Sequence, residues 1–229
     1  PISLLYSLVL FLRHKLYDWR LLKSKSFGTP NICVGNLNLG GTGKTPHIEY
    51  LIRLLSDDYK VAVLSRGYGR KTKGFLIADD SHSHNDVGDE PLQYFNKFKN
   101  IEVAVDENRC DGMKRLLQSE TPPQIILLDD AYQHRKIEPG LNILLTDYYN
   151  LYSNDHLVPS GNLRDIKKAA RRAEIIVVTK SPNVITPYYK KDIEDSLKPQ
   201  PHQKIFYSYI EYLDFQPFSK LSKNFDIDR

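Results

Sequence analysis

A glycine-rich stretch after a short apolar segment most constrains the fold of this 229-residue chain. It follows the run Ile32-Cys33-Val34 and reads Gly35-Asn36-Leu37-Asn38-Leu39-Gly40-Gly41-Thr42-Gly43-Lys44-Thr45. A strand that leads into such a loop and ends in Gly-Lys-Thr is typical of a phosphate-binding P-loop. The backbone N–H groups of that loop, and of the start of the next helix, face the anion. The stretch therefore predicts a nucleotide-binding α/β domain.

Each part of this loop has an expected role. Residues 40–43 supply the backbone around the phosphates, Lys44 reaches the β- and γ-phosphate oxygens, and the Thr45 hydroxyl can bind Mg²⁺. The strict pattern has glycine where this chain has Asn38. Because asparagine tolerates left-handed backbone conformations better than most residues, we expect the loop to close. The alternative, a flexible turn, does not explain the amphipathic helix and the acidic strand that follow.

Apolar runs alternate with helical patterns along the chain, as a mostly parallel sheet flanked by helices requires. The expected strands are Ile32–Gly35, Lys60–Ser65, Ile101–Val105, Gln124–Asp129, Asn142–Thr146 and Glu174–Thr179. The expected helices are Thr45–Ser56, Pro91–Lys99, Asn108–Ser119, Ile166–Arg172 and Tyr188–Leu197. We therefore predict a P-loop NTPase-like α/β domain over residues 28–200.

Two further stretches stand outside this alternation. The polar residues 79–86 predict a loop or a hairpin tip, and their two histidines have no third metal ligand nearby. After Pro199 the composition changes: Lys204–Tyr209 has the pattern of a strand, and an aromatic, charged stretch follows it. Residues 201–229 thus predict the opening of a second lobe that this chain does not complete.

The N-terminal 27 residues combine an apolar run with a cluster of cations. The run Ile2–Leu12 is too short to span a bilayer as seen, and charge follows it, whereas in a signal peptide charge precedes it. Between Arg13 and Lys25 there are five cations and a single acid, Asp18, which accounts for the net charge of +4. We interpret residues 1–27 as an amphipathic helix at a membrane surface. A helix packed on the sheet and a truncated membrane span are the alternatives.

The charge outside this cluster is balanced, so the sequence carries no general nucleic-acid footprint and no nucleic-acid partner is expected.

Carboxylates occur at two informative places. The apolar run from Ile125 ends in Asp129-Asp130, the usual companion of a P-loop, and one of these two side chains is expected to serve Mg²⁺. Either could instead cap a helix or form a turn. Between the P-loop and this strand lies Gly88-Asp89-Glu90-Pro91. Asp89 is either a helix cap or the base that accepts the proton of an attacking hydroxyl, with Glu90 helping to hold the metal.

Arginines follow another predicted strand. The sequence Ser65-Arg66-Gly67-Tyr68-Gly69-Arg70 leaves that strand at its carboxyl end, which is the ligand-binding edge of a doubly wound sheet. Arg66 and Arg70 offer forked donors for an anionic substrate group. Arg109 begins another helix in a similar place.

Taken together and in this order, the motifs resemble the tetraacyldisaccharide 4'-kinase family, the lipid A kinases of Gram-negative bacteria. The matching segments are Val34-Gly35-Asn36-Leu37 with Gly40–Pro46, Leu64–Arg70, Gly88–Pro91, Leu128-Asp129-Asp130 with Gln133-His134, Pro159–Arg164, and Val177–Lys180. The family also tolerates a residue other than glycine at the position of Asn38.

The resemblance implies ATP-dependent transfer of a phosphoryl group to the 4'-hydroxyl of a disaccharide 1-phosphate that carries four acyl chains. It also implies an enzyme at the cytoplasmic face of the inner membrane, held peripherally or by its N-terminus. By position, Asp89 is the general base, and Glu90 with Asp129 or Asp130 supplies the magnesium carboxylates. Arg109 matches an arginine implicated at the active site. Gln133 and His134 belong to a motif but receive no role.

Family members are longer and carry, in their second lobe, an Asp-His-His-like motif whose histidine pairs with the catalytic carboxylate. No such motif occurs in this sequence. We therefore expect a fragment with a mostly intact nucleotide site and an incomplete catalytic pair.

Two other classes of protein are compared with a lipid kinase. A P-loop switch or metallochaperone GTPase would share the Gly-Gly-Thr-Gly-Lys-Thr loop, but Thr179-Lys180-Ser181-Pro182 lacks the aspartate that reads guanine, and a metal-carrying cysteine pair is missing. A membrane scaffold without catalysis would not need Gly88-Asp89-Glu90 beside a complete phosphate loop.

Overall fold

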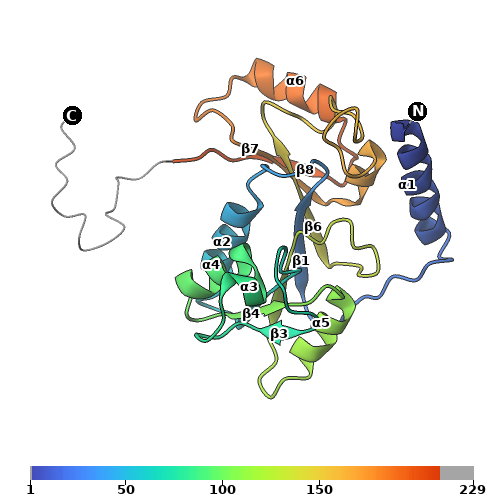
Figure 1. Ribbon diagram of the computed structural model, residues 1–229. Coiled ribbons are helices and arrows are strands. Elements are labelled where there is room, and N and C mark those ends of the chain that lie inside the picture. The colour runs from blue at the N-terminus through green and yellow to red at the C-terminus, as the bar shows by residue number, and fades with distance from the viewer. Residues whose placement is uncertain (1, 212–229) are drawn as a thin grey trace.

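One sheet of eight strands forms the centre of residues 2–211, the part of the chain that this computed structural model describes (Figure 1). The strand order is β3-β4-β2-β5-β1-β6-β7-β8, with β3 antiparallel to β4 and the other neighbours parallel. The strands are β1 (Asn31–Asn36), β2 (Val61–Ser65), β3 (Leu76–Ile77), β4 (Glu102–Val105), β5 (Ile125–Asp129), β6 (Leu141–Asp147), β7 (Ile175–Thr179) and β8 (Lys204–Tyr207). The predicted α/β class is confirmed.

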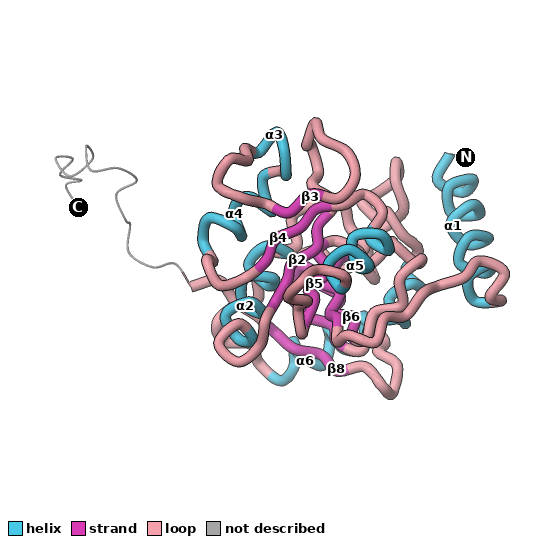
Figure 2. Tube along the Cα trace, turned by 90° about the horizontal axis from the view of Figure 1, so that it is seen from below, coloured by secondary structure: helices cyan, strands magenta, loops and turns pink. Residues whose placement is uncertain are grey.

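Residues that alternate along the strands build two cores, one on each face of the sheet. Cys33 and Leu128 belong to one core, whereas Val34 and Leu127 belong to the other, because successive side chains of a strand point to opposite faces. Figure 2 shows α2 and α4 on one side of the strands and α5 on the other. The helices are α1 (Ile2–Asp18), α2 (Lys44–Leu55), α3 (His84–Val87), α4 (Asp89–Lys97), α5 (Arg109–Leu117), the 3-10 helix η1 (Lys167–Arg172) and α6 (Pro187–Leu197).

The local differences from the predicted elements have local causes. The polar stretch 79–86, expected to be a loop or hairpin tip, contains the one-turn helix α3. A capping box starts this helix: Ser83 and Asp86 exchange side-chain and backbone hydrogen bonds. Lys167–Arg172 forms a 3-10 helix where a helix over Ile166–Arg172 is expected, and β3 has only two residues, too few to give a sequence pattern.

The strand expected to open a second lobe belongs instead to the main sheet. β8 pairs in parallel with β7, with Ile205 opposite Ile176 and Tyr207 opposite Val178. The predicted boundary at residue 201 is therefore wrong for this strand, because its backbone hydrogen bonds complete the sheet edge. The rest of the predicted lobe, residues 212–229, lies outside the described residues.

Helix α1 stands beside the sheet domain (Figure 1). It exposes more apolar side chains than it buries. Leu10, His14 and Tyr17 are its buried residues. Its exposed apolar side chains outnumber them and comprise Ile2, Leu4, Leu5, Leu8, Val9, Phe11, Leu12 and Leu16. Among residues 2–211, no helix is long and apolar enough to cross a bilayer. The helix therefore keeps much of its apolar surface away from the protein.

Candidate functional site

The phosphate loop has the backbone that its sequence predicts. β1 ends at Asn36 and α2 begins at Lys44. Gly40, Gly41 and Gly43 all have positive φ, at 74°, 63° and 78°, which only glycine adopts without strain. The Asn36 side chain donates a hydrogen bond of 2.7 Å to the Thr42 hydroxyl and so fixes the loop from inside.

Asn38 holds the loop for a reason other than the predicted one. It is not among the non-glycine residues with positive φ, so tolerance of left-handed backbone is not what the position uses. Asn38 instead forms a β-bridge with Leu163, and its side chain donates a hydrogen bond of 3.0 Å to Asp155. These contacts connect the phosphate loop to residues 155–163.

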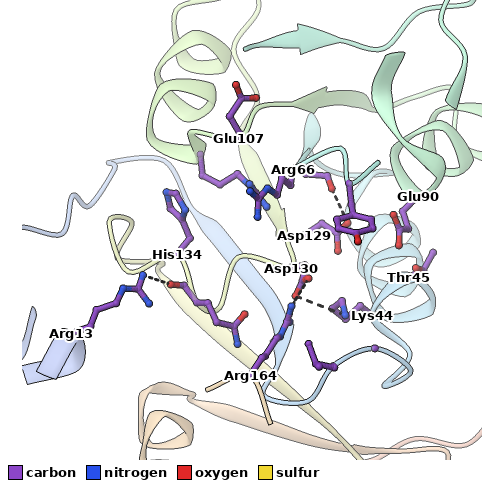
Figure 3. Close-up of a pocket in the computed structure, with 16 residues that line it drawn as sticks. Arg13, Lys44, Thr45, Arg66, Glu90, Glu107, Asp129, Asp130, His134 and Arg164 are labelled. Carbon is purple, nitrogen blue, oxygen red and sulfur yellow. Dashed lines mark hydrogen bonds and ion pairs between the residues drawn. The ribbon is translucent and has the colours of Figure 1, made fainter. Parts of the chain in front are cut away.

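A cavity of about 710 Å³ opens at the carboxyl ends of β1, β2 and β5 (Figure 3). It is lined by Arg13, Leu39, Gly40, Lys44, Thr45, Ser65, Arg66, Tyr68, Glu90, Glu107, Arg109, Asp129, Asp130, Gln133, His134 and Arg164. Open α/β sheets bind ligands at this edge. The structure therefore brings together most of the site residues predicted from separate parts of the sequence.

The two adjacent acids at the end of β5 lie in different surroundings. Asp129 is buried and accepts a hydrogen bond of 3.2 Å from Ser65. Asp130 has a left-handed backbone with φ of 47° and is bound by both terminal nitrogens of Arg164, one of them at 2.9 Å. The Lys44 ammonium lies 3.8 Å from Asp130. Figure 3 shows these partners converging on the acid pair.

These surroundings shift the two pKa values in opposite directions. Burial, helped by the charges of Asp130 and Glu90, raises the pKa of Asp129 to about 6. Burial also acts on Asp130, but the hydrogen bonds and charge of Arg164, with Lys44, outweigh it and hold the pKa of Asp130 below its usual range. Asp129 is thus the acid whose charge still lacks a partner.

The residues around Asp129 fit a hard divalent cation. Within residues 2–211, no cation of the protein forms an ion pair with Asp129. Thr45, Glu90 and Asp129 all line the same cavity and offer oxygen atoms. The described residues hold no group of three or more His, Cys, Asp or Glu able to bind a metal by themselves. The oxygen atoms of Thr45, Glu90 and Asp129 suit Mg²⁺, which uses few protein ligands together with phosphates and water.

Two glycines bring the arginine loop, residues 65–70, against the start of α4. Gly67 has φ of 68°, and a Cβ there would lie 2.7 Å from the Val87 carbonyl oxygen. Gly88 has φ of 94°, and a Cβ there would lie 3.0 Å from the Tyr68 carbonyl oxygen. Side chains at either position would separate the two loops. Their close approach places Arg66 and Glu90 in one cavity.

The structure separates each predicted pair of site residues. Glu90 lines the cavity, whereas its neighbour Asp89 is exposed at the start of α4 and is not a lining residue. Arg66 lines the cavity, whereas the side chain of Arg70 is only 4% exposed and binds Glu107 and the Gly74 carbonyl oxygen. The Arg70 guanidinium is therefore bound within the protein, and Arg70 is not a lining residue that could hold a substrate anion, the role that the sequence predicted for it.

Arg109 and His134 give the cavity a cationic wall and a neutral imidazole. Arg109 is buried and donates to the Asp106 carbonyl oxygen at 3.2 Å. Burial lowers its pKa to about 10, so it stays charged at neutral pH. Burial and the nearby cations, Arg109 first, lower the pKa of His134 to about 4. Its Nε2 atom is buried and has no hydrogen-bond partner in the described part of the chain.

The sequence predicted no role in the site for two arginines that the structure places in the cavity. Arg164 ends one of the quoted motifs, yet its partner Asp130 lies 34 residues away in the sequence. Arg13, in α1, lines the cavity and donates a hydrogen bond of 3.0 Å to the Gln133 carbonyl oxygen. The sequence around a basic residue in a helix does not indicate a contact with a residue 120 positions away.

The chain is similar in sequence to proteins of one family. The sequence profile of the family "Tetraacyldisaccharide-1-P 4'-kinase" matches residues 1–213. The tetraacyldisaccharide 4'-kinase of Bacteroides thetaiotaomicron is 48% identical over 229 residues, and that of Flavobacterium johnsoniae is 50% identical over 223. These matches cover 100% and 97% of this chain, but only 60% and 65% of the two relatives. The chain thus spans less than two thirds of the length of these relatives.

A solved structure agrees as well. The crystal structure of an "apo" form of LpxK from Aquifex aeolicus in complex with ATP is 31% identical, with a TM-score of 0.74. The match covers 96% of this chain and 84% of that one. A family profile that matches residues 1–213, relatives about half identical and a solved structure with a TM-score of 0.74 lead to one conclusion: the chain belongs to the tetraacyldisaccharide-1-P 4'-kinase family.

Proposed function

We propose that this protein transfers the γ-phosphoryl group of ATP to the 4'-hydroxyl of tetraacyldisaccharide 1-phosphate, a step of lipid A biosynthesis. The observation that carries the proposal is the single cavity that holds Lys44 and Thr45 of the phosphate loop, the acid pair after β5, and a wall of arginines. Phosphoryl transfer needs positioning and charge neutralisation more than covalent chemistry, and this cavity offers both. The names of the relatives and the ATP complex of the solved structure support the same reaction.

The phosphate loop forms the nucleotide end of the proposed site. Residues 40–43 surround the phosphates, and Lys44 binds the β- and γ-phosphate oxygens. Thr45, Glu90 and Asp129 would hold Mg²⁺, which when bound neutralises charge on these oxygens. We assign this role to Asp129 over Asp130, because Arg164 and Lys44 already compensate the charge of Asp130.

The acceptor end of the proposed site combines a base with cations. We assign the general base to Asp89, which directly precedes the lining residue Glu90 and whose carboxylate forms no ion pair among residues 2–211. Arg109 would stabilise the charge of the group in transfer. Arg66, an exposed residue of the arginine loop that lines the cavity, would bind the anionic end of the lipid.

Helix α1 supports peripheral contact with the cytoplasmic face of the inner membrane. Its exposed apolar side chains, with Trp19, Leu21 and Leu22 after it, match a helix that lies in the lipid interface, and cations from Arg13 to Lys25 would sit at the headgroups. Arg13 also lines the cavity, which supports a lipid surface close to the proposed acceptor end.

The alternative of a P-loop switch or metallochaperone has less support. Lys180 lies in the segment where a GTPase binds the guanine base. Its ammonium is 2.7 Å from Asp147 and is therefore already paired within the protein. Family membership also favours the kinase.

Incubation with ATP, Mg²⁺ and a detergent-dispersed tetraacyldisaccharide 1-phosphate tests the proposal, with the lipid analysed by mass spectrometry. We expect a product heavier by one phosphate group, and none with Lys44→Ala. Lys73→Ala, which removes an exposed cation outside the cavity, is the matched control and should behave as wild type. Nucleotide hydrolysis without a lipid product would contradict the proposed acceptor.

A further inference from the structure

Arg164 connects the acid pair to the phosphate loop. Its guanidinium binds both carboxylate oxygens of Asp130 and also the side-chain oxygen of Asn36. Asn36 in turn donates to the Thr42 hydroxyl and to the Gly40 carbonyl oxygen, at 2.7 and 3.3 Å. The position of this one side chain thus affects both the acid and the backbone that would surround phosphates.

The segment that carries Arg164 has no helix or strand of its own to fix it. The Arg164 N–H donates to the Leu37 carbonyl oxygen at 2.8 Å. Its carbonyl oxygen accepts a hydrogen bond of 2.9 Å from the Tyr6 hydroxyl of α1, 158 residues away. The next residue, Asp165, is fully buried and contacts His14 of the same helix at 2.6 Å. Helix α1 therefore holds the loop at the Arg164 carbonyl group and at the next residue.

The hydrogen bonds around His14 determine its tautomer. Arg135 lies 3.1 Å from Nδ1 of His14 and also donates to its carbonyl oxygen at 3.0 Å. Because a guanidinium has only donors, Nδ1 must accept, so the ring proton is on Nε2 and is donated to Asp165. Both ring nitrogens are used, and the imidazole is buried. The His14 side chain thus connects α1 to the loop that carries Arg164, and its hydrogen bonds fix its orientation.

Apolar packing explains little of how α1 is attached. Leu10 and Tyr17 are its only buried apolar residues in the described structure. Its polar side chains contact loops instead: Tyr6 and His14 contact residues 164 and 165, and Arg13 contacts the Gln133 carbonyl oxygen. Ser3 contacts residues 157 and 160, and Asp18 contacts Arg135. A helix that only covered a core would show the reverse balance.

We infer that Tyr6 and His14 are positioning residues that hold Arg164 against Asp130 and Asn36, so that the seating of α1 sets the geometry of the nucleotide site. This inference rests on the proposed function in one respect: the cavity is taken to bind ATP. It assigns to the N-terminal helix a role inside the site, in addition to contact with lipid.

A double-mutant cycle between Tyr6→Phe and Arg164→Ala tests the inference, with ATP affinity in the presence of Mg²⁺ measured by calorimetry. Tyr6→Phe should weaken ATP binding about three- to tenfold, the range for one lost hydrogen bond. In the Arg164→Ala background it should have no further effect, because the group it positions is gone. The stoichiometry fitted to the same titration gives the fraction of protein that is folded and able to bind, independently of the affinity. His14→Leu should show the same dependence on Arg164.

Tyr59→Phe is the matched control, since this exposed tyrosine lies outside the cavity and should leave ATP affinity unchanged. Equal losses for Tyr6→Phe in both backgrounds, or no loss in either, overturn the inference. A wild-type chain that binds ATP but gives no lipid product overturns the proposed acceptor, while the affinities still decide the role of Tyr6. A wild-type chain that does not bind ATP overturns both.

Discussion

Asp129 and Asp130 are neighbours in the chain, yet among residues 2–211 only Asp130 forms ion pairs with cations of the protein. Arg164 grips the Asp130 carboxylate with two nitrogens, whereas Asp129 receives a hydrogen bond from Ser65 and faces Asp130 and Glu90. The charge of Asp130 is therefore compensated within the protein, and Asp129 is the acid that we propose for the cation accompanying the nucleotide.

The first prediction concerns the pH dependence of nucleotide binding. Because the pKa of Asp129 is about 6, this side chain is increasingly protonated below that pH and must lose its proton before it can bind Mg²⁺. Affinity for Mg²⁺ with ATP should therefore fall about tenfold per unit below about pH 6 and level off above about pH 7. The terminal phosphate of ATP titrates in the same range, with a pKa of about 6.

The Asp129→Asn variant separates the two effects. In this variant the terminal phosphate of ATP still titrates, but residue 129 does not. The difference between the wild-type and variant profiles of affinity against pH, both measured by calorimetry, therefore isolates the contribution of Asp129. Parallel profiles would contradict the assignment of the metal to this residue.

The second prediction is that Asp129→Asn stabilises the nucleotide-free protein at neutral pH. A pKa raised in the folded state means that the folding contribution of Asp129 is present below the unfolded pKa, 3.8, and is lost as pH rises through about 6. Replacing the buried anion should therefore add about 1–3 kcal/mol to the free energy of unfolding at pH 8. Urea unfolding at pH 8 and pH 5 checks this, and the gain should shrink at the lower pH. An equal effect at both pH values would contradict the explanation.

The third prediction distinguishes Asp89 from Glu90. Asp89→Asn should lower kcat for lipid phosphorylation by about 10²–10⁴, the range for loss of a general base, while ATP affinity stays near wild type. Glu90→Gln should weaken the dependence on Mg²⁺ instead. Rates at saturating ATP, together with Mg²⁺ titrations, check both variants. If Glu90→Gln carries the large loss of kcat and Asp89→Asn is nearly silent, the base is Glu90, the residue that lines the cavity.

The fourth prediction contrasts the two arginines of one loop. Arg66→Ala should raise KM for the lipid with little change in the free energy of unfolding, because its side chain faces the cavity. Arg70→Ala should destabilise the fold by about 1–3 kcal/mol, because it leaves Glu107 and the Gly74 carbonyl oxygen without their buried partner. Steady-state kinetics and urea unfolding of both variants separate the roles. A higher KM for lipid in folded Arg70→Ala would restore the original expectation for this residue.

The fifth prediction concerns α1. Leu5→Glu and Leu12→Glu place charges among exposed apolar residues of the helix and should reduce binding to vesicles of phosphatidylethanolamine and phosphatidylglycerol at least about tenfold. Vesicle flotation measures the bound fraction. Val184→Glu, at a side chain that is 82% exposed outside α1, is the matched control and should bind as wild type. Unchanged flotation of both α1 variants would contradict the interfacial role.

Much of the fold could be predicted because its signals are local. The run from Ile125 to Asp129 and the loop from Gly40 to Thr45 each carry a pattern that one element explains by itself, and both lie where predicted. The second-lobe prediction failed at β8 because a strand pattern does not say which neighbour the strand pairs with. The short helix α3 was missed, although Ser83 and Asp86 are spaced as a capping box.

The sequence by itself determined the phosphate loop, the alternation of strands and helices, and the family, because these depend on residue types at short fixed spacings. Only the tertiary structure decided that Arg164 binds Asp130, that Arg70 binds Glu107 instead of lining the cavity, and that Tyr6 reaches the Arg164 carbonyl group. These contacts join residues 34, 37 and 158 positions apart. They form only when the strands have paired, so no local pattern of residues could specify them.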